Sequence, residues 1–133
     1  MQQISKVMQT PEAVSSSAFS DSGWLDAVVP GTVLTSLVHD GVYPDPYFSD
    51  NNRLAKGLIP DLAKAGRDFY SYWYRTRLEF PSQTYEGRHT WLQMDGINYH
   101  AEVWLNGQLV TTWTGMFLEE RVDISEYIHL DQE

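Results

Sequence analysis

The dipeptide Asn106-Gly107 constrains the fold of this 133-residue chain more than any other feature of its sequence. Asn-Gly between two stretches of alternating apolar and polar residues favours a two-residue type I′ turn, in which both residues take positive φ. The flanking stretches are residues 100–105 and 108–113, and each has the length of one strand. The sequence therefore predicts an antiparallel β-hairpin over residues 100–113.

Three further segments, residues 72–80, 90–94 and 119–124, have the composition of short strands. The first alternates strictly, so we expect a half-buried strand whose inward face is formed by Tyr74, Thr76, Leu78 and Phe80. Short strands separated by turn residues are typical of antiparallel sandwiches and barrels rather than of parallel sheets. We therefore predict an all-β fold.

One short helix is predicted ahead of these strands. Thr32 can cap its first turn, and Leu34, Leu37 and Val38 have the spacing of one helical face. Gly41 stands where a glycine commonly ends a helix. The predicted helix is about two turns long.

Three other segments in this half of the chain have no clear periodicity. Residues 1–22 are polar and are predicted to be loop, and residues 24–29 to be a short strand or a buried connection. Residues 42–69 begin with two prolines, which fit neither a helix interior nor a central strand. A loop of this length in a compact domain is usually functional or disordered, and its aromatic residues argue against disorder.

The charge and the cysteine content exclude several classes of function. With 9 Lys+Arg against 18 Asp+Glu, the formal net charge is −9. Such acidity argues against a nucleic-acid partner and against an anionic membrane surface. Without cysteine, the chain has no disulfide, zinc-thiolate site, iron–sulfur cluster or cysteine nucleophile. The sequence also shows no apolar run of transmembrane length and no signal-peptide core at its start.

No catalytic or metal-binding motif is recognisable, so we assign no catalytic residue, no metal and no cofactor to this chain. It has no nucleophile elbow, no zinc-protease motif and no phosphate-binding glycine loop. Eighteen acidic residues place some carboxylates near each other by chance, but their spacing singles out no acid/base pair. Asp45, Asp50 and Asn52 lack the spacing of an EF-hand loop. The four histidines are also without ligand spacing: His39, His89, His100 and His129.

Seven sequence blocks resemble the N-terminal sugar-binding domain of glycoside hydrolase family 2. Each block is weakly specific, but together they occur in the order of the family and extend over most of residues 24–128. The blocks are residues 29–34, 41–48, 73–76, 92–99, 101–107, 115–117 and 122–124. The motifs Pro30-Gly31-Thr32-Val33 and Tyr43-Pro44-Asp45-Pro46-Tyr47-Phe48 resemble the β-mannosidase and exo-β-glucosaminidase branch more than the β-galactosidase or β-glucuronidase branches.

The resemblance implies an all-β jelly-roll β-sandwich of the galactose-binding-domain type, with one short helix and one long loop. Residues 1–133 would be a single domain of a larger multidomain glycosidase. In that family a separate (β/α)₈ barrel holds the two glutamates of a retaining mechanism, so this chain alone is expected to be non-catalytic. The family's first strand would be represented only near residues 4–7, and its strand after residue 125 is missing. We therefore expect truncation at one or both ends.

Residues 42–52 are the candidate substrate-binding segment. Aromatic rings can stack on a pyranose face, and short polar side chains can bind sugar hydroxyls. Within the loop, Asp45, Asp50 and Asn51 are the candidate polar contacts. The alternative is that the loop is a structural plug against a neighbouring domain, and both roles are compatible.

Three functions remain open at this point. The first is an accessory domain that supports the barrel and lends a loop to its pocket; the others are an autonomous carbohydrate-binding module and a purely structural interaction domain. The expected partners are a carbohydrate substrate, bound through the parent enzyme, and other domains of the same chain. A dimer through exposed sheet edges is a further alternative. The compartment is unknown, and a bacterial periplasmic or secreted location would suit the parent.

Overall fold

The computed structural model describes residues 1–79 and 89–128 and consists of short strands and short helices. Its strands are β1 (Gln2–Gln3), β2 (Tyr72–Trp73), β3 (Trp91–Met94), β4 (His100–Leu105), β5 (Gln108–Thr114) and β6 (Glu120–Asp123). Its α-helices are α1 (Pro11–Ser15), α2 (Val33–His39) and α3 (Leu62–Ala65). Single 3₁₀ turns occur at η1 (Ile4–Lys6), η2 (Leu54–Lys56), η3 (Arg67–Tyr70) and η5 (Ser125–Tyr127). No helix in these described ranges is long and apolar enough to span a membrane.

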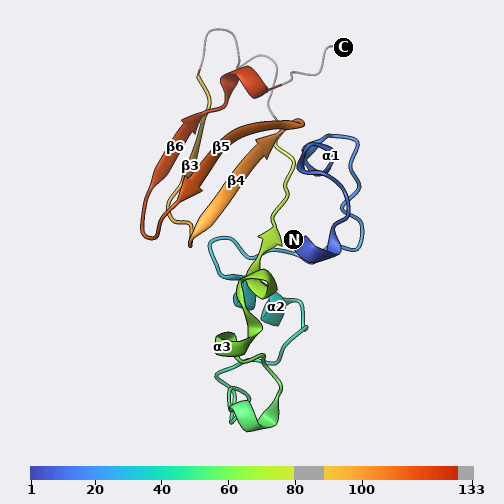
Figure 1. The fold of residues 1–133 in the computed structure, drawn as a ribbon, viewed down its shortest axis with the longest axis vertical. Coiled ribbons are helices and arrows are strands. Elements are labelled where there is room, and N and C mark those ends of the chain that lie inside the picture. Colours follow the sequence, from blue (N-terminus) through green and yellow to red (C-terminus); the bar gives the residue numbers. More distant parts are fainter. Residues whose placement is uncertain (80–88, 129–133) are drawn as a thin grey trace. The chain divides into compact units, whose positions relative to one another are not determined.

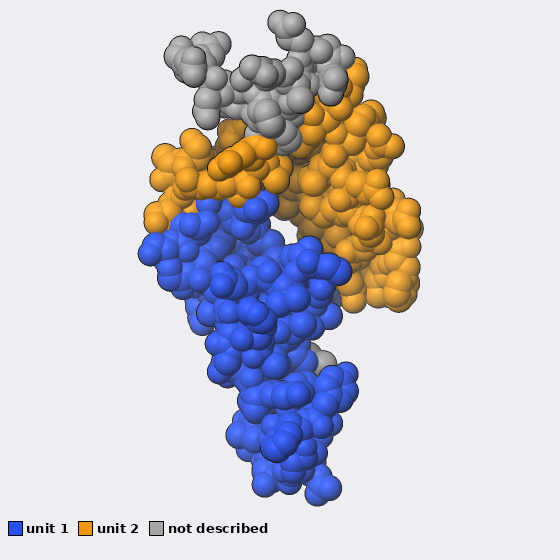
Figure 2. Space-filling model, turned by 180° about the vertical axis from the view of Figure 1, so that it is seen from behind, with its two compact units in different colours: residues 1–8, 21–76 blue, residues 9–20, 77–133 orange. Residues whose placement is uncertain are grey.

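The chain divides into two compact units (Figure 2). Unit 1 consists of residues 1–8 and 21–76, and unit 2 consists of residues 9–20 and 77–133. Each unit is therefore built from two separate stretches of sequence. The prediction that residues 1–133 form a single domain stays a prediction.

The predicted hairpin is confirmed in unit 2. Strands β4 and β5 pair antiparallel, with Leu105 opposite Gln108, and they lie side by side (Figure 1). The turn residues Asn106 and Gly107 have φ of 49° and 84°, as a type I′ turn requires. The Gly107 amide donates to Ser15 Oγ at 3.0 Å, which ties the end of α1 to this turn.

The strands predicted at residues 90–94 and 119–124 are confirmed as β3 and β6, and the structure pairs them antiparallel in unit 2. Trp91 lies opposite Asp123, and the Arg121 guanidinium carbon lies 4.4 Å from the centre of the Trp91 ring. The core of the unit contains Val14 of α1 and Ile124 after β6, which are 1% and 2% exposed. Because α1 contacts β4 and β5, its single buried side chain packs against the hairpin.

The predicted helix is confirmed as α2 in unit 1. The Thr32 hydroxyl accepts a hydrogen bond from the Thr35 amide at 3.1 Å, which is the expected N-cap. The helix ends at His39, and Gly41 follows with φ of 70°. Leu37 is its most buried apolar residue at 2% exposed.

The strand predicted over residues 72–80 is wrong for most of its length. Only Tyr72–Trp73 is a strand, paired with β1, and residues 74–79 have no regular secondary structure. Phe80 lies outside the described residues. Tyr74 and Leu78 are exposed, whereas Arg75, predicted to face outward, has a side chain only 8% exposed. Its Nη1 lies 2.7 Å from Asp21 Oδ2, so an ion pair overrides the alternating pattern.

The prediction of one helix is also wrong, because two more short helices lie in segments predicted to be loop. Helix α1 begins after Thr10, whose hydroxyl accepts from the Ala13 amide at 3.4 Å. Helix α3 begins after Asp61, whose Oδ1 accepts from the Ala63 amide at 3.1 Å. A polar side chain that caps a first turn stabilises helices too short to show apolar periodicity. The chain is thus mostly β with a few short helices.

Candidate functional site

The candidate loop, residues 42–52, is anchored where α2 ends. The amides of Val42 and Tyr43 both donate to the Leu37 carbonyl, at 2.8 and 3.3 Å. These bonds fix the direction in which the chain leaves the helix. The loop therefore starts from a buried residue of unit 1.

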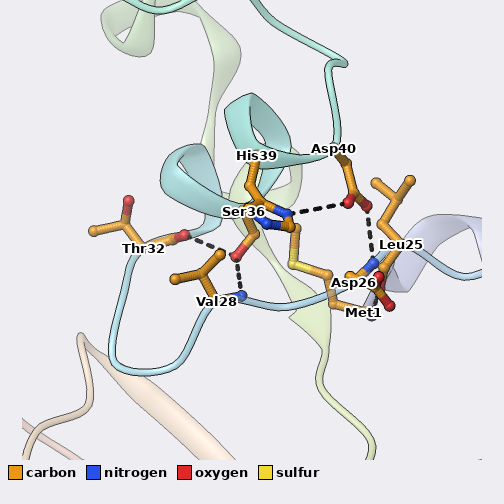
Figure 3. Close-up of polar contacts among 8 residues, drawn as sticks. All are labelled: Met1, Leu25, Asp26, Val28, Thr32, Ser36, His39 and Asp40. Carbon is orange, nitrogen blue, oxygen red and sulfur yellow. Dashed lines mark hydrogen bonds and ion pairs between the residues drawn. The ribbon is translucent and has the colours of Figure 1, made fainter.

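Helix α2 is itself fastened to the segment that precedes it, as Figure 3 shows. Ser36, which is fully buried, accepts from the Val28 amide at 3.0 Å and donates to the Thr32 carbonyl at 3.3 Å. Asp40 Oδ2 accepts from the Asp26 amide at 2.8 Å. Residues 24–29 are thus a connection rather than a strand, and they support the base of the candidate loop.

Two of the three predicted site residues, Asp45 and Asn51, are brought together. Asp45 Oδ1 accepts from the Tyr47 amide at 2.8 Å, a local turn typical of aspartate. Asn51 Nδ2 donates to the Asp45 carbonyl at 2.9 Å, and the Asn51 amide donates to the Phe48 carbonyl at 3.2 Å. These bonds close residues 45–51 into a turn held by its own polar groups.

The third predicted residue, Asp50, faces a cation. Its Oδ2 lies 3.4 Å from Lys56 Nζ, and both side chains are partly exposed. An exposed pair of this kind contributes little to stability, about 0–1 kcal/mol. Asp50 is therefore placed at the surface of the loop, next to a positive charge.

The turn presents two aromatic rings to solvent. Tyr47 is 93% exposed and Phe48 is 71% exposed. Ser49 follows with φ of 53°, a value uncommon outside glycine. Asp45 and Asn51 fix the backbone of this turn and thereby hold the two rings exposed. The sequence had predicted these two side chains as contacts to a ligand.

A cavity of about 280 Å³ lies beside the loop in unit 1. Pro46 and Asn52 line it, together with Leu54 from η2 and Tyr70 from η3. Sequence reasoning missed Leu54 and Tyr70. The only signal for Tyr70 is its place in the aromatic stretch before Trp73, and nothing in the sequence marks Leu54.

The polar neighbours of the histidines do not form the group of several ligands that a metal ion needs. His39, His89 and His100 lie near Asp40, Asp123 and Thr114, respectively, and His129 falls outside the described residues. Within residues 1–79 and 89–128, no group of three or more histidine or acidic side chains is close enough to hold a metal ion.

In unit 2, Asp123 lies between a histidine and a serine. His89 Nδ1 is 2.5 Å from Asp123 Oδ2, while Ser125 donates to Asp123 Oδ1 through its hydroxyl at 2.5 Å and its amide at 2.9 Å. The serine proton is directed at the carboxylate and not at the imidazole, which is not the arrangement of an activated nucleophile. Ser125 Oγ also accepts from the Thr90 amide, so the cluster joins the ends of β3 and β6.

These bonds predict a pH dependence. The hydrogen bonds from Ser125, and then His89, lower the pKa of Asp123 to about 2 from its usual 3.8. Because the pKa is lower in the folded state, the stabilisation is complete above the unfolded value and is lost as the pH falls from about 4 towards 2. We expect the difference in urea midpoint between the wild type and Asp123→Asn to shrink over this range. A difference that stays constant would contradict the prediction.

Comparison with known proteins agrees with the resemblance. Residues 8–133 match the family model described as glycosyl hydrolase 2 galactose-binding domain-like. No solved structure is significantly similar to the chain.

The similar curated proteins are glycosidases by name. A mannosylglycoprotein endo-β-mannosidase of Lilium longiflorum is 38% identical over 81% of this chain and 11% of its own length. An exo-β-D-glucosaminidase of Amycolatopsis orientalis is 30% identical over 96% of this chain and 12% of its own. A β-galactosidase of Arthrobacter sp. (strain B7) is 28% identical over 89% of this chain and 11% of its own length.

The chain spans only about an eighth or less of the length of these relatives. The match, by contrast, takes in nearly all of the chain, including both hairpin strands and the candidate loop. The predicted family is therefore confirmed: the chain belongs to the glycosyl hydrolase family 2 galactose-binding domain-like family.

Proposed function

We propose that this chain is the non-catalytic N-terminal domain of a retaining exo-β-glycosidase of the β-mannosidase or exo-β-glucosaminidase type. Its fold is a jelly-roll β-sandwich, it supports the catalytic barrel, and it lends residues 42–52 to the substrate pocket. The family match and the two mannosidase and glucosaminidase relatives support this proposal. The lily relative is named an endo-enzyme, but the exo-glucosaminidase matches a larger share of the chain.

The observation that carries the proposal is the display of Tyr47 and Phe48 by a turn that is already closed. Exposed rings provide stacking surfaces for the apolar face of a sugar. A turn held by Asp45 and Asn51 before binding loses less conformational entropy when a ligand arrives. The loop is therefore suited to border a carbohydrate pocket.

The polar site residues keep capacity for a ligand in this proposal. A carboxylate can accept about four hydrogen bonds, and one to Asp45 comes from Tyr47. Asp50 is partly exposed and would accept from a sugar hydroxyl or attract an amino sugar. The net charge of −9 would favour approach of a cationic glucosamine unit, although it does not distinguish mannose from glucosamine chemistry.

The test is Tyr47→Ala in the full-length glycosidase that carries this domain. The ring is 93% exposed in the domain, so its removal leaves the fold intact and removes only what the ring contacts in the enzyme. We expect kcat/KM for the β-linked oligosaccharide to fall about tenfold, which corresponds to about 1.4 kcal/mol. Met8→Ala removes a side chain that is 89% exposed in the same unit and is the matched control.

Two results would favour the other functions. If Tyr47→Ala leaves kcat/KM unchanged, the domain is structural and the loop is a plug. If isothermal titration of the 133-residue chain with mannose, glucosamine or their β-linked oligomers gives saturating heats, the chain is an autonomous carbohydrate-binding module.

A further inference from the structure

The hairpin turn of unit 2 contains the asparagine of this chain that can lose ammonia most easily. Asn106 is followed by Gly107, whereas the other three asparagines are followed by residues that carry a side chain. Glycine has no Cβ, so nothing obstructs an attack by its backbone nitrogen on the side-chain carbonyl carbon of the residue before it. The turn is therefore also a candidate site of spontaneous covalent modification.

The reaction at such a turn is deamidation through a cyclic imide. The Gly107 nitrogen gives up its proton to a base and bonds to Asn106 Cγ, the Cγ–Nδ2 bond breaks, and ammonia leaves. Water then opens the ring at either of its two carbonyl carbons. The product at position 106 is an aspartate or an isoaspartate, and in the isoaspartate the main chain runs through the side-chain carboxyl carbon. In both products an oxygen has replaced the amide nitrogen.

Two hydrogen bonds occupy both reacting groups in the folded chain. The Gly107 amide donates to Ser15 Oγ at 3.0 Å, so its proton is directed at a hydroxyl and away from a base in solvent. Asn106 Nδ2 donates to the Tyr127 carbonyl at 2.7 Å, so the side chain is directed at η5 and away from its own backbone. Attack of the nitrogen on Cγ therefore requires that these bonds open.

Helix α1 controls the first of these bonds. Ser15 Oγ donates to the Glu12 carbonyl at 3.3 Å, which leaves its lone pairs for the Gly107 amide. A Cβ placed on Gly107 would lie 3.6 Å from the Glu12 carbonyl oxygen, so the helix lies directly against the turn. A helix of five residues is not stable by itself, and Val14 is the one buried side chain of α1. Local detachment of α1 therefore costs less than unfolding of the whole unit.

We propose that Asn106 is a deamidation site that docked α1 protects, and that its reaction releases η5 from the hairpin turn irreversibly. Detachment of α1 frees the Gly107 amide, and the imide forms from that open state. The reaction thus converts a reversible opening into a permanent change. This inference is independent of the proposed function, because it concerns only bonds within unit 2.

The product cannot restore the bond to η5. The Asn106 amide nitrogen is a donor, but both oxygens of a carboxylate are acceptors, as is the Tyr127 carbonyl. At the 2.7 Å of the present bond, two such oxygens repel each other. An isoaspartate also adds one main-chain carbon to a turn in which Leu105 lies opposite Gln108, so it disturbs the pairing next to the turn.

The first test measures deamidation of Asn106 in the full 133-residue chain by peptide mass spectrometry during incubation at mildly alkaline pH. We expect Ser15→Ala to react about fivefold faster than the wild type, the factor that corresponds to one neutral hydrogen bond. Ser15→Thr keeps a hydroxyl at this position and should react as slowly as the wild type. Ser17→Ala removes an exposed hydroxyl two residues further along and is the matched control, with an unchanged rate.

Rates in concentrated urea separate protection by the fold from the reactivity of the dipeptide. Without structure, the wild type and the three variants should deamidate at one common rate, faster than that of the folded wild type. Equal rates for the folded wild type and folded Ser15→Ala would overturn the proposal. So would a folded wild type that reacts as fast as it does in urea, or a Ser15→Thr variant that reacts as fast as Ser15→Ala.

The second test measures the consequence with Asn106→Asp, which reproduces the aspartate product. We expect the Tyr127 amide, which donates to the Ile124 carbonyl at 3.0 Å, to exchange about tenfold faster than in the wild type. Gln108→Glu makes the same change of charge at an exposed residue next to the turn and should leave this exchange unchanged. An unchanged rate in Asn106→Asp, or an equal acceleration in Gln108→Glu, would overturn the release of η5.

Discussion

Leu37→Ala is expected to lower the free energy of unfolding by about 2–5 kcal/mol. Leu37 is 2% exposed, and the buried apolar side chains of the described residues are few: Met1, Val14, Leu37 and Ile124. Its carbonyl also accepts the two amides that start the candidate loop. Since a whole domain is stable by about 5–15 kcal/mol, this one change could remove much of the stability of unit 1.

Urea unfolding followed by tryptophan fluorescence measures this effect in the isolated chain. Leu54→Ala deletes the same atoms from a residue that is 66% exposed, so it should shift the midpoint little. Equal shifts for the two variants would mean that α2 is not packed as described.

Asp21→Asn is expected to cost about 2 kcal/mol of unfolding free energy. It removes the carboxylate that lies 2.7 Å from Arg75 Nη1, and that arginine side chain is only 8% exposed. A buried cation that loses its counter-ion costs about 3–5 kcal/mol in a fully buried pair. Asp21 is 45% exposed, so solvent screens the pair and the expected cost is smaller.

A double-mutant cycle isolates this pair. With Arg75→Met added, Asp21→Asn should cost distinctly less than it does alone, because the charge to be compensated is gone. Additive costs of the two changes in urea unfolding would show that the ion pair does not stabilise the fold.

Elements governed by neighbouring residues could be predicted from the sequence. Asn106-Gly107 determines its turn because only a few residue types accept positive φ at both positions. Helix α2 has its cap, its apolar face and its terminating glycine within ten residues. Helix α1 had a readable signal too, since Thr10-Pro11-Glu12 is a common helix start.

Features that depend on distant residues could not be predicted. The alternation after Trp73 predicts a strand only if another strand lies alongside, and the described partner, β1, is two residues long. Arg75 is turned inward by Asp21, which is 54 residues away. For the site, the sequence indicated residues 42–52 with Asp45, Asp50 and Asn51, and this assignment stays a prediction. The sequence could not show that Asp45 and Asn51 bond to the loop itself, or that the Tyr70 hydroxyl is buried.

The interleaving of the two units has a consequence for synthesis and for dissection of the chain. Each unit combines an early and a late stretch of the chain. Strand β1 can pair only once β2 has been synthesised, and Ser15 can bond to Gly107, 92 positions later, only once that residue has been synthesised. During translation, neither unit can close until its second piece has left the ribosome. No single cut of the backbone can release one unit whole, and an expression start at residue 21 would remove a strand from one unit and a helix from the other.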